Sequence, residues 1–336
     1  MDLFKKCICF TDIHLGLRAN SKLHNEDCLD FINWFIEEGK SRGAETCIFL
    51  GDFFHHRNTV NSQTLEYAIK VLSLLNDAFE KTYFLVGNHD LYFRDNRSVT
   101  SLKFATLFPK IKLIDNPEII GDVALVPWLV EDEWKEVEKF NSKYVFGHLE
   151  IPGFKMNALV EMPDHGGLNK TALRNHDYVF SGHFHKRQTQ GKIQYIGNPF
   201  GHNYADVWDF ERGAMFLEWG EEPEYIDYLE GPRFIAINLA ALLEEPDTYL
   251  KPKSYLQVTL DVDITYEEAT FIKETFMESH EIRELKLIRK DEEDHVIEFD
   301  GEISFQTVDQ IVTEGLTGID KGSFDAAKLI EIYNSL

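Results

Sequence analysis

The chain repeats one arrangement five times in its first 200 residues: a short apolar run, followed at once by a cluster that contains Asp, Asn or His. The runs are strand-length, rich in β-branched and aromatic residues, and nearly unbroken by polar side chains, which is typical of strands buried on both faces. They occupy residues 7–11, 46–50, 82–86, 143–146 and 177–181. A chain with five such runs is expected to fold as an α/β protein around a buried sheet.

Helical patterns separate the first three runs. Residues 26–38 place apolar side chains on one face and end near Gly39. Residues 63–80 show the same pattern and follow Ser62, a residue type that caps helix N-termini. Strands that alternate with helices at this spacing predict a sheet with parallel strands.

The net charge of −24 is distributed unevenly along the chain. Residues 1–200 contain 26 acidic and 23 basic side chains, a net of −3, whereas residues 201–336 contain 32 and 11, a net of −21. This shift predicts a boundary. We place a first domain at 1–230, a small α+β domain at 231–302 and a helical segment at 303–336. An acidic chain lacks general attraction to nucleic acid, so DNA binding would need locally placed basic groups.

Neither a membrane span nor a disulfide framework is predicted. No run approaches the roughly 18 apolar residues that cross a bilayer, and the first residues do not resemble a secretory signal. The cysteines are Cys7, Cys9, Cys28 and Cys47, with no C-x-x-C pair among them. We expect a soluble, cytoplasmic protein whose cysteines are buried and inert.

The five polar clusters all follow the carboxyl ends of predicted strands. In an open α/β sheet these ends share one edge, where ligands bind. Side chains far apart in the sequence are therefore expected to be neighbours in space. The clusters are Asp12-Ile13-His14, Gly51-Asp52 with His55, Gly87-Asn88-His89-Asp90, Gly147-His148 and Gly182-His183-Phe184-His185.

Carboxylate, amide and imidazole groups together form a mixed ligand set for first-row divalent metals. One such motif alone is weak, because it also occurs in ordinary capped loops; the five in order predict a metal centre. The ligands exceed what one ion needs, and two ions about 3.5–4 Å apart would use them all to activate water for phosphoryl displacement. A remaining histidine could protonate the leaving oxygen.

The order and spacing of the clusters resemble those of the calcineurin-like metallophosphoesterase superfamily. GDFFH (51–55) resembles the G-D-x-F-H form of SbcD-type nuclease subunits of DNA double-strand-break repair complexes. IGNPFG (196–201) and the C-terminal layout are most similar to the recombination nuclease subunits of T-even-type bacteriophages. The resemblance implies a two-sheet sandwich flanked by helices, followed by a capping domain at 231–302 and a helical docking segment at 303–336. Protein phosphatases of the superfamily carry a GNHE motif, which this chain lacks.

The resemblance also implies a role for each matching residue. One metal is held by Asp12, His14, Asp52 and His185 and the other by Asp52, Asn88, His148 and His183, with Asp52 bridging. The metals implied are two Mn²⁺, with Mg²⁺ possible in vivo. His89 is the leaving-group acid or transition-state stabiliser, His55 positions the substrate phosphate, and Asp90 orients His89.

Other polar residues are assigned less specifically. Basic side chains near the clusters are candidates for DNA contacts at the rim of the site, and each is also compatible with an ordinary surface charge: Arg18, Arg57, Arg94, Arg97, Lys186 and Arg187. His56 is expected either to face solvent or to contact the site residues without touching metal or substrate. The histidines without a partner pattern are expected to be structural or exposed: His24, His165, His176, His202, His280 and His295. Among them, His202 follows IGNPFG closely and could also approach the site.

The function implied by the resemblance is that of a DNA nuclease in recombination, repair and replication. It implies exonuclease activity on duplex DNA and endonuclease activity on single strands. It also implies a coiled-coil ABC-type ATPase as partner, a homodimer within a heterotetramer, and a location in the host-cell cytoplasm for a phage protein.

Several alternatives stay open. The tail patterns 305–315 and 324–335 suit docking onto the ATPase or packing on their own domain. The chain could instead be a phosphodiesterase or phosphatase for small nucleotides or phosphoproteins. It could also be a non-catalytic scaffold of the ATPase complex.

Overall fold

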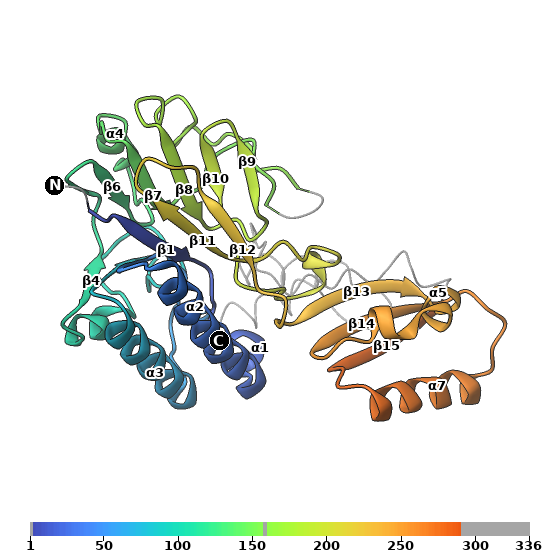
Figure 1. The fold of residues 1–336 in the computed structure, drawn as a ribbon. Coiled ribbons are helices and arrows are strands. Elements are labelled where there is room, and N and C mark those ends of the chain that lie inside the picture. The colour runs from blue at the N-terminus through green and yellow to red at the C-terminus, as the bar shows by residue number, and fades with distance from the viewer. Residues whose placement is uncertain (1–2, 157–159, 290–336) are drawn as a thin grey trace, which may run out of the picture. The chain divides into compact units, whose positions relative to one another are not determined.

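Two six-stranded sheets and one three-stranded sheet form the framework of this computed structural model (Figure 1). The structure describes residues 3–156 and 160–289. The predicted helical segment at 303–336 and the end of the predicted capping domain lie outside the described residues. Within the described ranges, no helix combines the length and apolarity needed to cross a bilayer.

The first sheet has the order β12-β11-β1-β2-β3-β4. Its strands are β1 (Lys6–Phe10), β2 (Thr46–Phe49), β3 (Lys81–Leu85), β4 (Ile111–Ile114), β11 (Gly213–Glu218) and β12 (Glu224–Asp227). Strands β1 to β4 are parallel, as predicted for the first three, whereas β11 pairs antiparallel with β1.

The second sheet has the order β5-β6-β7-β8-β10-β9. Its strands are β5 (Glu118–Ile120), β6 (Val123–Val126), β7 (Tyr144–His148), β8 (Tyr178–Gly182), β9 (Gln188–Gln190) and β10 (Ile193–Tyr195). The four central strands are parallel, and the edge strands β5 and β9 are antiparallel to their neighbours.

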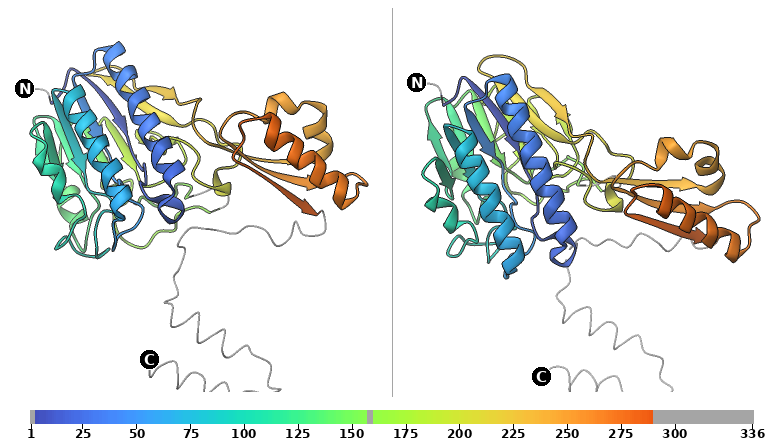
Figure 2. Two further views of the ribbon diagram at one scale, coloured as in Figure 1. Left: turned by 90° about the horizontal axis from the view of Figure 1, so that it is seen from below. Right: turned by 60° about the horizontal axis from the view of Figure 1, so that its bottom comes forward.

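Both faces of β1 are buried, which explains its unbroken apolar sequence. Ile8 and Phe10 pack under the helices α2 (Lys22–Arg42) and α3 (Ser62–Ala78), which lie side by side (Figure 2). Cys7 and Cys9 face the second sheet and pack in the core that Phe146 and Phe180 share. The predicted sandwich flanked by helices is therefore confirmed, and all four cysteines are buried and free.

Shorter helices occur between these elements. They are α1 (Leu17–Asn20), η1 (Lys103–Leu107), α4 (Trp134–Val137) and η2 (Tyr204–Asp206). The N-cap of α3 is Asn61, whose side chain accepts from the N–H of Gln63, so the predicted cap Ser62 is wrong by one residue.

The third sheet contains β13 (Arg233–Asn238), β14 (Ser254–Leu260) and β15 (Glu284–Arg289), all parallel. Its helices are α5 (Leu239–Glu244), α6 (Pro246–Tyr249) and α7 (Tyr266–Ser279). These strands and helices have their own apolar core around Leu256 and Leu285. The division into domains stays a prediction.

Asp27 of α2 forms a buried ion-pair group with two cations of the C-terminal part. Its carboxylate accepts from both terminal nitrogens of Arg283 at 2.9 and 3.1 Å and lies 3.1 Å from Lys253. Asp27→Ala should lower the free energy of unfolding by about 1–3 kcal/mol, because both cations lose a partner. Urea denaturation measures this difference.

Asp30 provides the matched control. Its carboxylate lies 2.8 Å from Lys253 but is 54% exposed. Asp30→Ala should change the free energy of unfolding by no more than about 0.5 kcal/mol. Equal losses for the two variants would contradict a special role of Asp27.

Candidate metal centre

The five clusters meet at one place but come from two sheets. Three follow β1, β2 and β3, and two follow β7 and β8 of the second sheet. The expectation of one shared sheet edge is therefore wrong, although the predicted convergence is correct. Two glycines permit the close approach: a Cβ on Gly87 would lie 2.2 Å from the backbone N of Asp52, and one on Gly182 would lie 2.0 Å from Oγ1 of Thr11.

The predicted ligands fall into two groups. Potential ligand atoms lie within 4.8 Å of one another in Asp12, His14 and His185, and likewise in Asp52, His148 and His183. Several of these residues have left-handed backbone conformations, with positive φ at Asp12, His14, Asp52 and His183. Non-glycine residues adopt this region rarely, and such strain is concentrated at functional sites.

In the second group, hydrogen bonds outside the centre fix the histidine tautomers. Nδ1 of His148 lies 2.7 Å from the carbonyl O of Leu50, to which it donates. Its Nε2 therefore faces Oδ1 of Asn88 at 2.9 Å and Oδ1 of Asp52 at 3.4 Å. In neutral His148, with Nδ1–H donating to Leu50, Nε2 carries a lone pair, so a cation between these three atoms would be coordinated by all of them.

His183 completes this group. Its Nε2 lies 3.2 Å from Oε2 of Glu150, and its Nδ1 lies 3.0 Å from Oδ1 of Asn88. Burial works to raise the pKa of Glu150, but His183 and then Arg94 outweigh it and the pKa is lowered. Glu150 has no role in the sequence-based prediction; its only sequence signal is its place two residues after His148.

In the first group, two imidazole nitrogens face each other. Nε2 of His14 lies 3.2 Å from Nε2 of His185, and each lies 4.0 Å from Oδ1 of Asp12. Burial lowers the pKa of His185 to about 4 and lowers that of His14 well below its usual value. Both are neutral near pH 7, as metal ligation requires.

The Asp52 carboxylate lies between the two groups. Its Oδ1 is directed at His148, and its Oδ2 lies 3.7 Å from Nε2 of His14. Burial works against a charge on His148, yet Asp52 and then Asp12 raise the pKa of His148 to about 9. The environment therefore favours positive charge, and the donors fit two divalent cations bridged by Asp52. Ligation by the seven residues stays a prediction.

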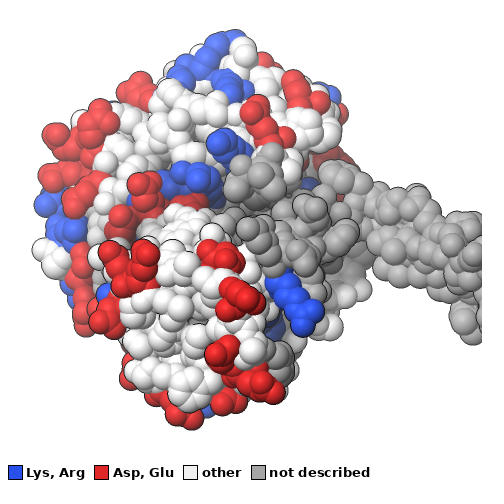
Figure 3. Space-filling model, turned by 90° about the vertical axis from the view of Figure 1, so that its right-hand side faces the viewer, with Lys and Arg blue, Asp and Glu red and all other residues white. Residues whose placement is uncertain are grey.

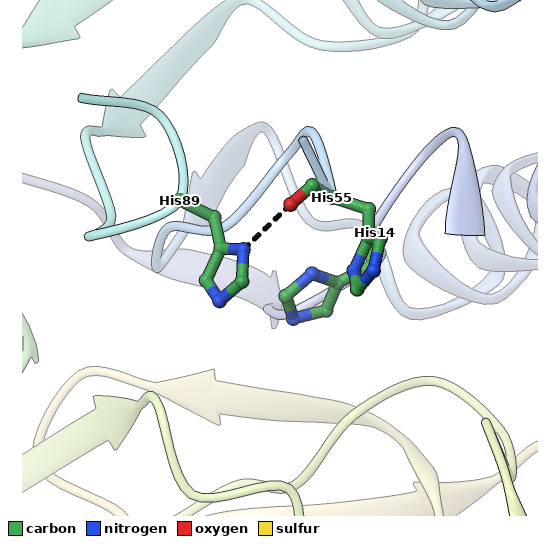
Figure 4. Close-up of side chains that lie close together, drawn as sticks. All are labelled: His14, His55 and His89. Atoms are coloured by element: carbon green, nitrogen blue, oxygen red, sulfur yellow. Dashed lines mark hydrogen bonds between the residues drawn. The ribbon is translucent and has the colours of Figure 1, made fainter. Parts of the chain in front are cut away.

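His89 lies beside the first group with His14 and His55 (Figure 4). Its Nδ1 lies 2.6 Å from the carbonyl O of His55. The His55 ring is nearly parallel to that of His89 at 5.6 Å between centroids, and the His14 ring is edge-on at 4.8 Å. The His89 ring is thus fixed with Nδ1–H donating to the His55 carbonyl.

The expected role of Asp90 needs a correction. Its carboxylate accepts from the backbone N–H groups of Asp52, Phe53, Phe54 and Gly87 at 2.9–3.1 Å. The described contacts give His89 Nδ1 the His55 carbonyl as partner instead. Asp90 joins the loops after β2 and β3 and positions the site indirectly.

The basic residues proposed for DNA contacts differ in exposure. The side chains of Arg94 and Lys186 are 58% and 41% exposed. Arg97 is largely buried and bonded to Glu133. Arg187 is largely buried against Asp227.

The other two candidates are Arg18 and Arg57, which are both half-buried. Arg18 bonds the carbonyl O of His202 and lies over the Tyr255 ring. The surroundings of Arg18 favour a structural role.

His202 is closer to the centre than the sequence predicts. It is buried, and its ring centroid lies 5.2 Å from that of His185 and 5.5 Å from that of His14. Its N–H donates to Asp206 at 2.7 Å. The isolated sequence position of His202 gives no partner pattern, so only the tertiary structure reveals this neighbourhood.

Comparison with known proteins gives the family of the chain. Residues 5–187 match the calcineurin-like phosphoesterase family. Exonuclease subunit 1 of Enterobacteria phage T4 is 29% identical over 230 residues, which are 66% of this chain and 67% of that protein.

Two solved structures are also similar. The nuclease MPE of Pseudomonas putida is 19% identical with a TM-score of 0.30, and the alignment covers 56% of this chain and 66% of that one. A dimetal phosphatase from Danio rerio is 12% identical with a TM-score of 0.38, covering 68% and 100%. The family match spans more than half of the 336 residues and includes all five clusters, so this chain belongs to the calcineurin-like phosphoesterase family, a family of metal-dependent hydrolases.

Proposed function

We propose that this phosphoesterase is a DNA nuclease of recombination and double-strand-break processing that uses two Mn²⁺ ions, or Mg²⁺ in vivo. It acts as an exonuclease on duplex DNA and as an endonuclease on single strands. The observation that carries the proposal is the arrangement of two ligand groups around Asp52 with His89 fixed beside them. The similarity to a phage exonuclease subunit supports the choice of DNA as substrate.

Two bound cations would supply charge for the phosphate oxygens and a water nucleophile. The protein supplies the proton: with Nδ1–H donating to the His55 carbonyl, the Nε2 proton of a charged His89 is free for the leaving oxygen. Burial, and then His89, lower the pKa of His55 to about 3. His55 is therefore a neutral hydrogen-bonding group for a phosphate oxygen rather than a cation.

A partner is part of the proposal. Acidic side chains are spread over much of the face shown in Figure 3, and the basic ones form small groups. Because phosphate affinity requires positive charge, we propose that a coiled-coil ABC-type ATPase supplies much of the DNA affinity, with two copies of this chain in a heterotetramer. The T4 relative is named a subunit, which supports a multi-subunit assembly.

The test of catalysis is DNA cleavage by the purified chain with Mn²⁺, on duplex and single-stranded substrates. His89→Ala should lower kcat by about 10²–10⁴-fold, because it removes the proton donor. Two Mn²⁺ per chain should remain bound, since His89 is outside both ligand groups. The neighbouring His56→Ala is the matched control and should cleave normally. Loss of Mn²⁺ from His89→Ala, or nucleotide turnover without DNA cleavage by the parent protein, would contradict the assignment.

Metal counting tests the bridging position. Asp52→Ala should lose both ions, because each ligand group depends on one of its oxygens, whereas His185→Ala should retain one. Equilibrium dialysis with Mn²⁺ gives the stoichiometry, and circular dichroism verifies folding. Retention of one tightly held ion in a folded Asp52→Ala protein would rule out the bridge.

The partner proposal leads to a deletion experiment. Removal of 303–336 should abolish binding to the ATPase while Mn²⁺-dependent cleavage continues at the basal rate. Co-purification measures the binding. Unchanged affinity for the ATPase would assign docking to another surface.

A further inference from the structure

One carboxylate connects a predicted metal ligand with an exposed arginine. Oε2 of Glu150 lies 3.2 Å from Nε2 of His183 and 3.2 Å from Nη2 of Arg94. Glu150 follows β7, and Arg94 lies in the loop after β3, so the contact joins loops of different sheets. Neither Glu150 nor Arg94 belongs to the five sequence clusters.

The contact with Glu150 determines which nitrogen His183 offers to the centre. Because Nε2–H donates to the carboxylate, Nδ1 keeps its lone pair and faces Oδ1 of Asn88 at 3.0 Å. The Trp128 ring packs on His183 with 5.0 Å between centroids. Together the carboxylate and the indole fix both the tautomer and the orientation of His183, as carboxylates behind metal-bound histidines do elsewhere.

The same two groups position Arg94. Its guanidinium carbon lies 5.5 Å from the centroid of Trp128, and Nε1–H of Trp128 donates to the backbone O of Arg94 at 3.1 Å. More than half of the Arg94 side chain is exposed. A guanidinium presents several donors in a planar fork, which suits a phosphate even while one donor stays on Glu150.

We propose that Glu150 is a positioning residue that orients His183 for the second metal and Arg94 for a phosphate of the DNA strand. The proposal rests on the proposed nuclease function for its substrate, but its metal side is independent of DNA. Because both side chains contact the Glu150 carboxylate, Arg94 and His183 are held in fixed positions relative to each other. A DNA strand bound at Arg94 therefore lies beside the metal centre.

Mn²⁺ binding without DNA tests the His183 side. Glu150→Ala should weaken one of the two Mn²⁺ sites by about 10–100-fold, the usual effect of removing a group behind a metal-bound histidine. Glu150→Gln should restore most of this affinity, because its amide oxygen still accepts from His183. Glu133→Ala is the matched control: Glu133 pairs with Arg97 near the same tryptophan and should leave Mn²⁺ binding unchanged.

DNA binding tests the Arg94 side. Arg94→Ala should raise KM for DNA and reduce the slope of log affinity against log salt by about one, as expected for one lost phosphate contact. Its Mn²⁺ affinity should not change.

The outcomes separate this inference from the proposed function. Unchanged Mn²⁺ affinity in Glu150→Ala, or no rescue by Glu150→Gln, would overturn the positioning role even if the parent protein cuts DNA. An unchanged KM and salt slope in Arg94→Ala would overturn the phosphate contact. The parent protein could fail to cut DNA while Glu150→Ala still binds Mn²⁺ more weakly. This result would contradict the nuclease function and the phosphate contact, but the role of Glu150 toward His183 would stand.

Discussion

The site depends on one buried carboxylate whose described hydrogen bonds are all to backbone N–H groups. Asp90 accepts four backbone hydrogen bonds, three from the loop after β2 and one from the loop after β3. Burial raises the pKa of Asp90 to about 7, although the amides of Gly87 and Phe54 favour its charged form. Through these bonds the backbone of Asp52 is held against Gly87, and both ligand groups take their positions from Asp52. Asp90, the neighbour of His89 in the sequence, thus holds two backbone segments together.

The second constraint is the packing of the two sheets. The ligand groups draw on loops of both, so their separation is set by the inner core that Cys9 and Leu50 form with Phe146 and Phe180. Well-packed interiors deform little. The distance between the two ligand groups is therefore determined by apolar side chains of this inner core. A change in the volume of one of these side chains would shift the strands and, with them, the ligand groups.

Much of the fold could be predicted from local pattern, because unbroken apolar runs mark strands buried on both faces and Gly-containing clusters mark their carboxyl ends. The pattern could not assign β7 and β8 to a separate sheet. A strand that is buried on both faces has the same unbroken apolar sequence in whichever sheet it lies. It also misassigned the partner of His89. A histidine bonded to a carbonyl 34 residues away leaves no trace in spacing. The positions of Glu150 and His202 near the site could not be predicted for the same reason, because they result from tertiary contacts.

The left-handed conformations of Asp12, His14, Asp52 and His183 have an evolutionary consequence. Each costs about 1 kcal/mol relative to glycine, which adopts this region freely. Glycine at any of these positions would relieve strain while deleting a predicted ligand. Thermal stability alone would therefore favour glycine at these four positions, whereas the proposed chemistry requires the side chains that glycine lacks.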